Sequence, residues 1–165
     1  MNHGRILMFS GIALFISGCI AGVVIACDLF TSYHAAVGGH VEAILNGILL
    51  LLAGVARHHL RLGNFSKFIA HIGLEIAAWV HPCTYYWVAY TGYYYKILRK
   101  GTAQATTKPS AVDEAMIYFL LIGCVGYGLI TSLPLLLWGF RGIVDPSDNT
   151  IATVHPEPQV DKKRQ

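Results

Sequence analysis

Four long apolar segments constrain this chain more than any other feature of its sequence. They cover residues 6–26, 35–56, 66–92 and 115–140. An α-helix needs about 20 residues to cross about 30 Å of hydrocarbon, and each segment reaches that length. Because a backbone in lipid must satisfy its own hydrogen bonds, each segment is expected to be helical. The pattern therefore predicts an all-α fold, in which residues 1–142 form an integral membrane bundle of four helices.

Composition agrees with a membrane protein and excludes several other classes. Charged residues make up only 13% of the 165 residues, whereas soluble domains have about 25%. So few charges cannot cover the surface of a soluble domain, and so apolar a chain is not disordered over most of its length. The formal net charge of +3, with a basic run only at the C-terminus, also argues against a nucleic-acid partner.

The polar ends of the chain bear on its orientation and location. Residues 143–165 are polar and contain proline, so we expect a disordered tail. If the helices alternate, eight basic residues share the side of both termini and four lie on the other side, which places both termini in the cytosol. Lys162 and Lys163 resemble a dilysine retrieval signal, although an ordinary basic tail is equally consistent. The expected location is therefore a bacterial inner membrane or, if the signal is real, the endoplasmic reticulum membrane.

The second apolar segment contains three polar side chains, His40, Glu42 and Asn46. Ionisable groups in lipid are costly and usually face a cavity, a partner or the bundle interior. His40 shares a helix face with Ala43 and Gly47, and these small residues are predicted to leave an open surface beside the imidazole. A flat macrocycle needs such a surface, but small residues also serve plain helix packing.

The third segment has polar residues at four-residue steps on two sides. One side carries His71, Glu75 and Trp79, and the other carries Ala77, His81 and Tyr85. Pro82 removes a backbone donor and is expected to kink the helix, and the carbonyl that it frees must find another partner. One functional interpretation is a b-type cytochrome, in which His40 and either His71 or His81 are the two axial ligands of a haem.

Several of these residues resemble one known family. The element His40-x-x-x-x-Leu45-Asn46-Gly47 is similar to the His-(x)4-Leu-Asn-Gly element of the styrene oxide isomerases, small bacterial membrane proteins with four helices. Trp79 and Tyr85 fall at family positions, and the start at His3-Gly4 is similar as well. The resemblance covers about residues 3–95, and the fourth segment matches only in being apolar.

The resemblance implies an enzyme, a membrane epoxide isomerase. Members of the family are homotrimers that hold haem b between neighbouring subunits, with the histidine equivalent to His40 as the single axial ligand. Ferric iron acts as a Lewis acid on a small apolar epoxide, and a 1,2-shift then gives a carbonyl product (a Meinwald rearrangement). Asn46 and Tyr85 correspond to the residues that orient the epoxide. The implied partners are this substrate, the lipid bilayer and two further copies of the chain.

Two departures from the family pattern leave other functions open. Ala77 stands where the family has an acidic residue, and His81 stands where it has asparagine. A different substrate shape or reaction outcome would follow if the missing acid steers the substrate. The alternatives are a haem-free isomerase or cyclase that uses Glu42 or Glu75 as a proton donor, or a non-enzyme, either the cytochrome or a structural membrane subunit.

Overall fold

The computed structural model describes residues 3–93, 95–98 and 108–141, and these residues form helices and no strand. The all-α prediction is therefore confirmed for this part of the chain. The elements are α1 (His3–Ala26), α2 (Tyr33–Ala56), η1 (Arg57–His59), α3 (Asn64–Thr91), α4 (Ala111–Tyr118), η2 (Phe119–Gly126) and α5 (Tyr127–Phe140). The predicted tail over residues 143–165, with Lys162 and Lys163, lies outside the described residues.

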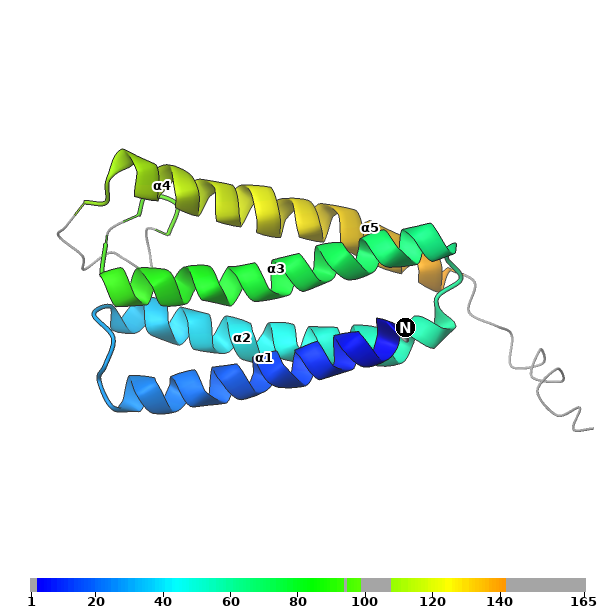
Figure 1. The fold of residues 1–165 in the computed structure, drawn as a ribbon, viewed down its shortest axis with the longest axis horizontal. Coiled ribbons are helices and arrows are strands. Elements are labelled where there is room, and N and C mark those ends of the chain that lie inside the picture. The colour runs from blue at the N-terminus through cyan, green and yellow to red at the C-terminus, as the bar shows by residue number, and fades with distance from the viewer. Residues whose placement is uncertain (1–2, 94, 99–107, 142–165) are drawn as a thin grey trace, which may run out of the picture.

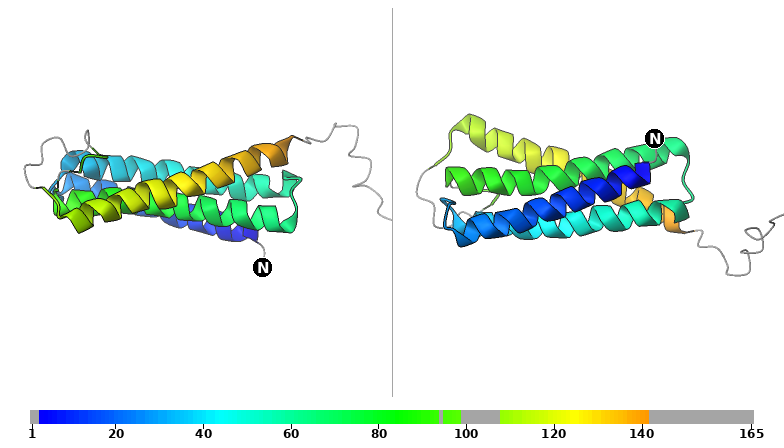
Figure 2. Two further views of the ribbon diagram at one scale, coloured as in Figure 1. Left: turned by 90° about the horizontal axis from the view of Figure 1, so that it is seen from above. Right: turned by 60° about the horizontal axis from the view of Figure 1, so that its bottom comes forward.

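The long helices run side by side (Figure 1), and the other views agree (Figure 2). α1 packs mainly on α2, α2 packs on α3, and α3 packs on the continuous helix made by α4, η2 and α5. The start of α1, η1 and the end of α5 lie at one end of the molecule, and the start of α4 lies at the other end (Figure 1). Successive long helices therefore run in opposite directions.

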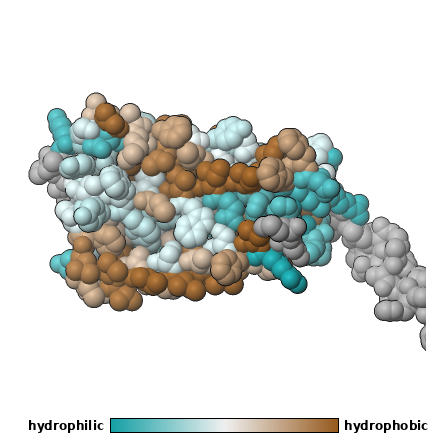
Figure 3. All heavy atoms as spheres, viewed as in Figure 1, coloured by the Kyte–Doolittle hydropathy of each residue, from teal (hydrophilic) through white to brown (hydrophobic). Residues whose placement is uncertain are grey.

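In the described ranges, three helical segments are long and apolar enough to cross a membrane, namely His3–Ala26, Tyr33–His59 and Ala111–Phe140. α3 has 28 residues but is not among them, because His71, Glu75 and His81 interrupt its apolar sequence. Large apolar side chains on the outside, such as Phe9 and Leu137, are exposed, and apolar surface extends along the length of the molecule (Figure 3). Lipid is the environment in which such a surface is stable.

Each long helix begins two to four residues before the apolar segment predicted for it. Polar residues form these first turns, as at the start of α4, where Ser110 and Asp113 form a reciprocal capping box. That box supplies partners for backbone N–H groups that the first helical turn leaves unpaired. α3 ends at Gly92, whose φ of 65° lies in the left-handed region that glycine adopts without strain.

The fourth helical segment differs from the plain α-helix that was expected. Residues Phe119–Gly126 form a π-helix between α4 and α5. π-helical turns insert an extra residue into the helical repeat and locally widen the helix. The π-helix therefore changes which side chains of this segment face α3, and one of them, Val125, lines a small cavity there.

Glycine residues bring α1 and α2 into backbone contact. A Cβ atom at Gly47 would lie 2.8 Å from the Gly11 carbonyl oxygen, and one at Gly11 would lie 2.7 Å from the Gly47 carbonyl oxygen. At the same interface, Gly18 lies against Ala43 and Ile44. Small residues allow helices in membranes to approach closely, and van der Waals contact then holds them together. The close contact with α1 therefore fixes the position of α2 and of its polar residues.

We predict that Gly47→Leu destabilises the protein, because its side chain has no room between α2 and the backbone of α1. Overpacking of a tight contact costs about 1–3 kcal/mol, which thermal unfolding in detergent will show as a lower melting temperature. Val55→Leu is the matched control, because Val55 lies on the same helix with 60% of its surface exposed. Equal melting temperatures for the two variants would contradict this account of the interface.

Candidate functional site

His40 projects from α2 toward α1. Its Nδ1 lies 2.8 Å from the Gly18 carbonyl oxygen. Because a carbonyl oxygen only accepts, Nδ1 carries the hydrogen, and in the neutral ring Nε2 keeps a free lone pair. Gly22 provides the space for the imidazole, since a Cβ atom there would lie 2.9 Å from His40 Cε1. Gly18 and Gly22 of α1 thus hold and orient this histidine.

Ala43 and Gly47 do not leave the open surface that was expected beside His40. Ala43 is fully buried, and Gly47 touches the backbone of Gly11 and Phe15 in α1. Within one chain, α1 therefore fills the space that these small residues create, because their shape suits a close helix contact. A role for either residue at a haem stays a prediction and requires an approach from outside the α1–α2 contact.

Asn46 lies on another side of α2 and faces α3. Its Nδ2 donates a hydrogen bond of 3.3 Å to the Ala78 carbonyl oxygen. That carbonyl is the one that Pro82 leaves without its usual helical donor, because proline has no N–H. α3 continues through Pro82, so the amide of Asn46 replaces a missing backbone bond. The need for such a partner follows from the sequence, and the structure identifies Asn46 as the donor.

His81, Glu42 and Tyr85 form a polar cluster between α2 and α3. His81 Nδ1 lies 3.1 Å from Glu42 Oε2, and their side chains are 25% and 31% exposed. The Tyr85 ring packs edge-on against His81, with ring centres 5.5 Å apart, and it fits over Gly38. No hydrogen bond of the Tyr85 hydroxyl is found in the described part of the chain. The cluster is therefore held in place but remains reachable from outside.

A small cavity adjoins this cluster. Its volume is about 20 Å³, and Asn46, Ala77 and His81 line it together with Val125 and Leu129. A space of this size holds about one water molecule. Asn46, Ala77 and His81 are thus brought together, but one chain encloses no room for a substrate there.

Glu75 and Trp79 belong to a separate network between α3 and α1. Trp79 Nε1 donates to Ser10 Oγ at 2.8 Å, and Ser10 Oγ donates to Glu75 Oε2 at 2.6 Å. Glu75 Oε1 and His71 Nδ1 are buried and have no hydrogen-bond partner among the described residues, and the His71 ring meets the His3 ring edge-on. The structure therefore places Glu75 and Trp79 apart from His81 and Tyr85.

His40, His71 and His81 have separate partners in the described part of the chain and do not form a two-ligand site there. His40 faces α1, His81 pairs with Glu42, and His71 meets His3. No group of three or more His, Cys, Asp or Glu side chains in the described residues has the arrangement of a metal site. His40 and His81 each have Nδ1 held by a partner, which leaves Nε2 of either ring as the nitrogen that could bind a metal.

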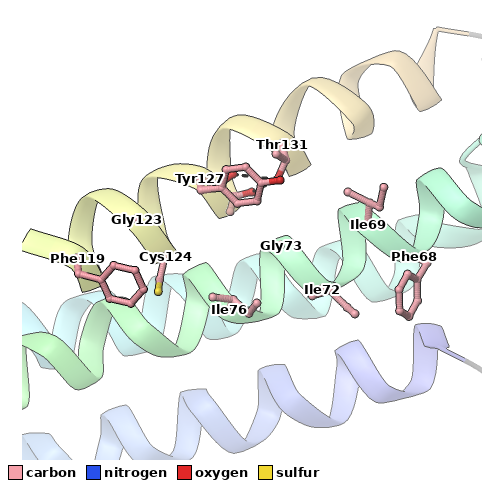
Figure 4. A pocket seen from close by; sticks show the side chains of 11 residues that line it. Phe68, Ile69, Ile72, Gly73, Ile76, Phe119, Gly123, Cys124, Tyr127 and Thr131 are labelled. Atoms are coloured by element: carbon pink, nitrogen blue, oxygen red, sulfur yellow. Dashed lines mark hydrogen bonds between the residues drawn. The ribbon is translucent and has the colours of Figure 1, made fainter. Parts of the chain in front are cut away.

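A further hollow lies elsewhere, in an apolar groove between α3 and the η2–α5 segment (Figure 4). Its volume is about 310 Å³, and Ile72, Ile76, Phe119 and Tyr127 are among the residues that line it. None of the predicted site residues lines the groove. Its apolar walls offer contact to hydrocarbon but no arrangement of acid, base or ligand groups.

The sequence interpretation missed three residues that support the candidate site. Ser10 joins Trp79 to Glu75, Gly22 makes room for His40, and Gly38 makes room for Tyr85. Ser10 carried a signal, since it is a hydroxyl in an uncharged apolar segment and needs a partner. The two glycines gave no specific signal, because space for a ring depends on which helix lies opposite.

We predict that Ser10→Ala costs about 1–3 kcal/mol of unfolding free energy, because it leaves the Trp79 N–H and the Glu75 carboxyl without their shared partner. Chemical denaturation in detergent measures this loss. Ser17→Ala is the matched control, because Ser17 bonds only to the Leu14 carbonyl oxygen of its own helix. If the control loses as much stability as Ser10→Ala, the network does not join the two helices.

Comparison with known proteins identifies the family. The family model described as styrene oxide isomerase matches residues 3–141, so the match continues through the fourth helical segment, where the resemblance rested only on apolar character. No curated protein and no solved structure matches the chain. This match covers more than half of the chain, and the helices bring the motif residues of α2 and α3 together. The match establishes membership of the family. The chain belongs to the styrene oxide isomerase family, a family of isomerases.

Proposed function

We propose that this protein is a haem-dependent epoxide isomerase, a four-helix transmembrane bundle that works as a homotrimer. The observation that carries the proposal is the hydrogen bond from His40 Nδ1 to the Gly18 carbonyl. It leaves the lone pair of the neutral ring on Nε2, and histidines that bind metals commonly have their other nitrogen anchored in this way. The residues present therefore fit a haem with one axial histidine.

The surroundings of His40 also fit a large flat ligand between copies. The ridge of α2 next to His40 carries Val41 and Leu45, which are 45% and 56% exposed. A haem bound by Nε2 would rest on apolar surface of this kind, and a neighbouring copy would cover its other side. Ala43 and Gly47 then act indirectly, by fixing α2 on α1 so that His40 cannot turn away.

One chain cannot bring all the predicted groups to a single iron. His40 and Glu42 are two residues apart, and in an α-helix such residues point to nearly opposite sides. Asn46 and Tyr85 lie on the side of Glu42 and His81, where α2 meets α3. We therefore infer that His40 of one copy faces Asn46 and Tyr85 of the next, which makes the trimer part of the active site.

Ferric haem would supply a Lewis acid for the epoxide oxygen. The chain's own groups assist at that oxygen: Asn46 has a second Nδ2 hydrogen beyond the one given to Ala78, and the Tyr85 hydroxyl has a hydrogen to donate. As the carbon–oxygen bond breaks, positive charge grows on carbon, and the Tyr85 ring face can stabilise it. A hydride shift from the neighbouring carbon then gives the carbonyl product with no change in oxidation state.

The membrane contributes by excluding water. A carbocation in water is captured as a diol, so the rearrangement needs a dry site. Apolar epoxides concentrate in lipid, and the helices expose apolar side chains along their length. We propose that the protein spans the membrane four times, including α3, with both termini in the cytosol, in a bacterial inner membrane or the endoplasmic reticulum membrane.

We predict that the protein purified with its cofactor shows a Soret absorption band and converts styrene oxide to phenylacetaldehyde. His40→Ala is expected to abolish both, because the variant loses its iron ligand. His34→Ala is the matched control, since His34 is exposed on the same helix and packs beside Tyr33. A His40→Ala protein that keeps its Soret band and its activity would disprove the assignment.

A mixing experiment tests whether the site is shared between copies. His40→Ala and Asn46→Ala are each expected to be inactive alone. Co-expressed trimers should regain up to about one third of the activity, because one of the three interfaces then combines an intact His40 with an intact Asn46. If both groups act from the same chain, no mixture contains an intact site and activity stays absent.

A further inference from the structure

The proposed function assigns no role to the Glu42–His81 pair. The pair joins α2 to α3 through the 3.1 Å contact between Glu42 Oε2 and His81 Nδ1. Two ionisable groups at this depth are costly even when paired, and the helices have other contacts that hold them together. Packing alone therefore does not account for the pair.

The pair lies among the residues assigned to the substrate. His81 packs against Tyr85 and lines the same small cavity as Asn46. Ala77, one helical turn before His81, supplies no acid at the position where the family has one. The only carboxylate that the structure brings to His81 in the described residues is Glu42, which comes from the neighbouring helix.

The contact fixes which nitrogen of His81 is free. A carboxylate accepts hydrogen bonds, so Nδ1 carries the hydrogen and Nε2 of the neutral ring carries the lone pair. No hydrogen bond of Nε2 is found among the residues that the structure describes. Glu42 thus holds the His81 ring in the way that a carboxylate positions a histidine that acts as a general base. Because the pair is partly exposed, a substrate can reach Nε2.

We propose that His81, oriented by Glu42, acts as a general base that diverts the opened epoxide to an allylic alcohol. The inference rests on the proposed function and concerns epoxides of alkyl-substituted alkenes, which have a hydrogen on the carbon beside the cationic centre. The carbon–oxygen bond breaks and oxygen keeps its electron pair. The neighbouring C–H proton moves to His81 Nε2, and the C–H electrons form the carbon–carbon double bond. Return of the proton to oxygen completes an isomerisation that consumes no oxidant or reductant.

Styrene oxide has no such neighbouring alkyl hydrogen, so it cannot give an allylic alcohol and its expected product remains the aldehyde. Comparison of the two kinds of epoxide therefore separates the base from the ring-opening step. An alkyl epoxide should give the alcohol only where a base is positioned beside the cation. His81 is the group in the described cluster with a free lone pair on nitrogen, and Glu42 acts by its charge and its hold on the ring.

The test uses the purified protein with its cofactor, supplied separately with styrene oxide and with 1-methylcyclohexene oxide, and measures products by gas chromatography. We expect mainly allylic alcohol from the second epoxide. His81→Asn and Glu42→Gln should each lower the ratio of allylic alcohol to ketone at least about tenfold, since general bases contribute factors of about 10²–10⁴. Glu75→Gln is the matched control, because this carboxyl bonds to Ser10 in the other network, and it should leave the ratio unchanged.

A second readout is independent of turnover. In protein labelled with ¹⁵N-histidine, His81 should show a protonated Nδ1 and an unprotonated Nε2, and Glu42→Gln should change this pattern while Glu75→Gln should not. Two results would overturn the inference: the wild-type protein forms only ketone from 1-methylcyclohexene oxide, or both His81→Asn and Glu42→Gln leave the product ratio unchanged. In either case, conversion of styrene oxide would still support the proposed function. Conversion of neither epoxide contradicts the proposed function, and the inference falls with it.

Discussion

The structure depends on a simple constraint, that polar groups inside apolar helices must find partners on neighbouring helices. The hydrogen bond from His40 to Gly18 is the most consequential case, because it ties α2 to α1 and also determines which imidazole nitrogen is free. Close contact through Gly11 and Gly47 makes this bond possible, since the imidazole reaches the backbone of α1 only at short helix separation. The same bond that joins the two helices thus leaves Nε2 free for the proposed haem iron.

On the side of α2 that faces α3, a side chain replaces a missing backbone hydrogen-bond donor. Pro82 frees the Ala78 carbonyl, and Asn46 bonds to it, so a break in the hydrogen bonding of α3 becomes an anchor for a predicted substrate-binding residue. The Glu42–His81 contact adds a charged connection between the same helices. The two sides of α2 therefore carry different polar groups, one with the proposed iron ligand His40 and one with the groups proposed to contact the epoxide. This division is why we infer that an active site is completed by a neighbouring copy.

Sequence patterns were sufficient for the helices but only partly sufficient for the site. Apolar segments of membrane length and four-residue steps depend on local periodicity, so they located α1, α2 and α3 and the stripe of Ala77, His81 and Tyr85. Contacts between helices depend on their rotation and separation, which a single sequence does not encode locally. For that reason Ala43 and Gly47 were assigned an open surface that α1 in fact fills, and the π-helical turn over Phe119–Gly126 was missed. The need to re-satisfy a carbonyl near Pro82 was predictable, whereas the donor Asn46 was not.

The central claim is that His40 Nε2 of one copy holds a haem against the Asn46 side of the next. A cryo-electron microscopy structure of the protein purified with its cofactor tests it most directly. The account predicts a trimer with a planar density bonded to His40 Nε2 at each subunit boundary and facing Asn46 and Tyr85 of the adjacent copy. A haem bound elsewhere, or His40 Nε2 enclosed by its own helices with no cofactor beside it, would contradict the account.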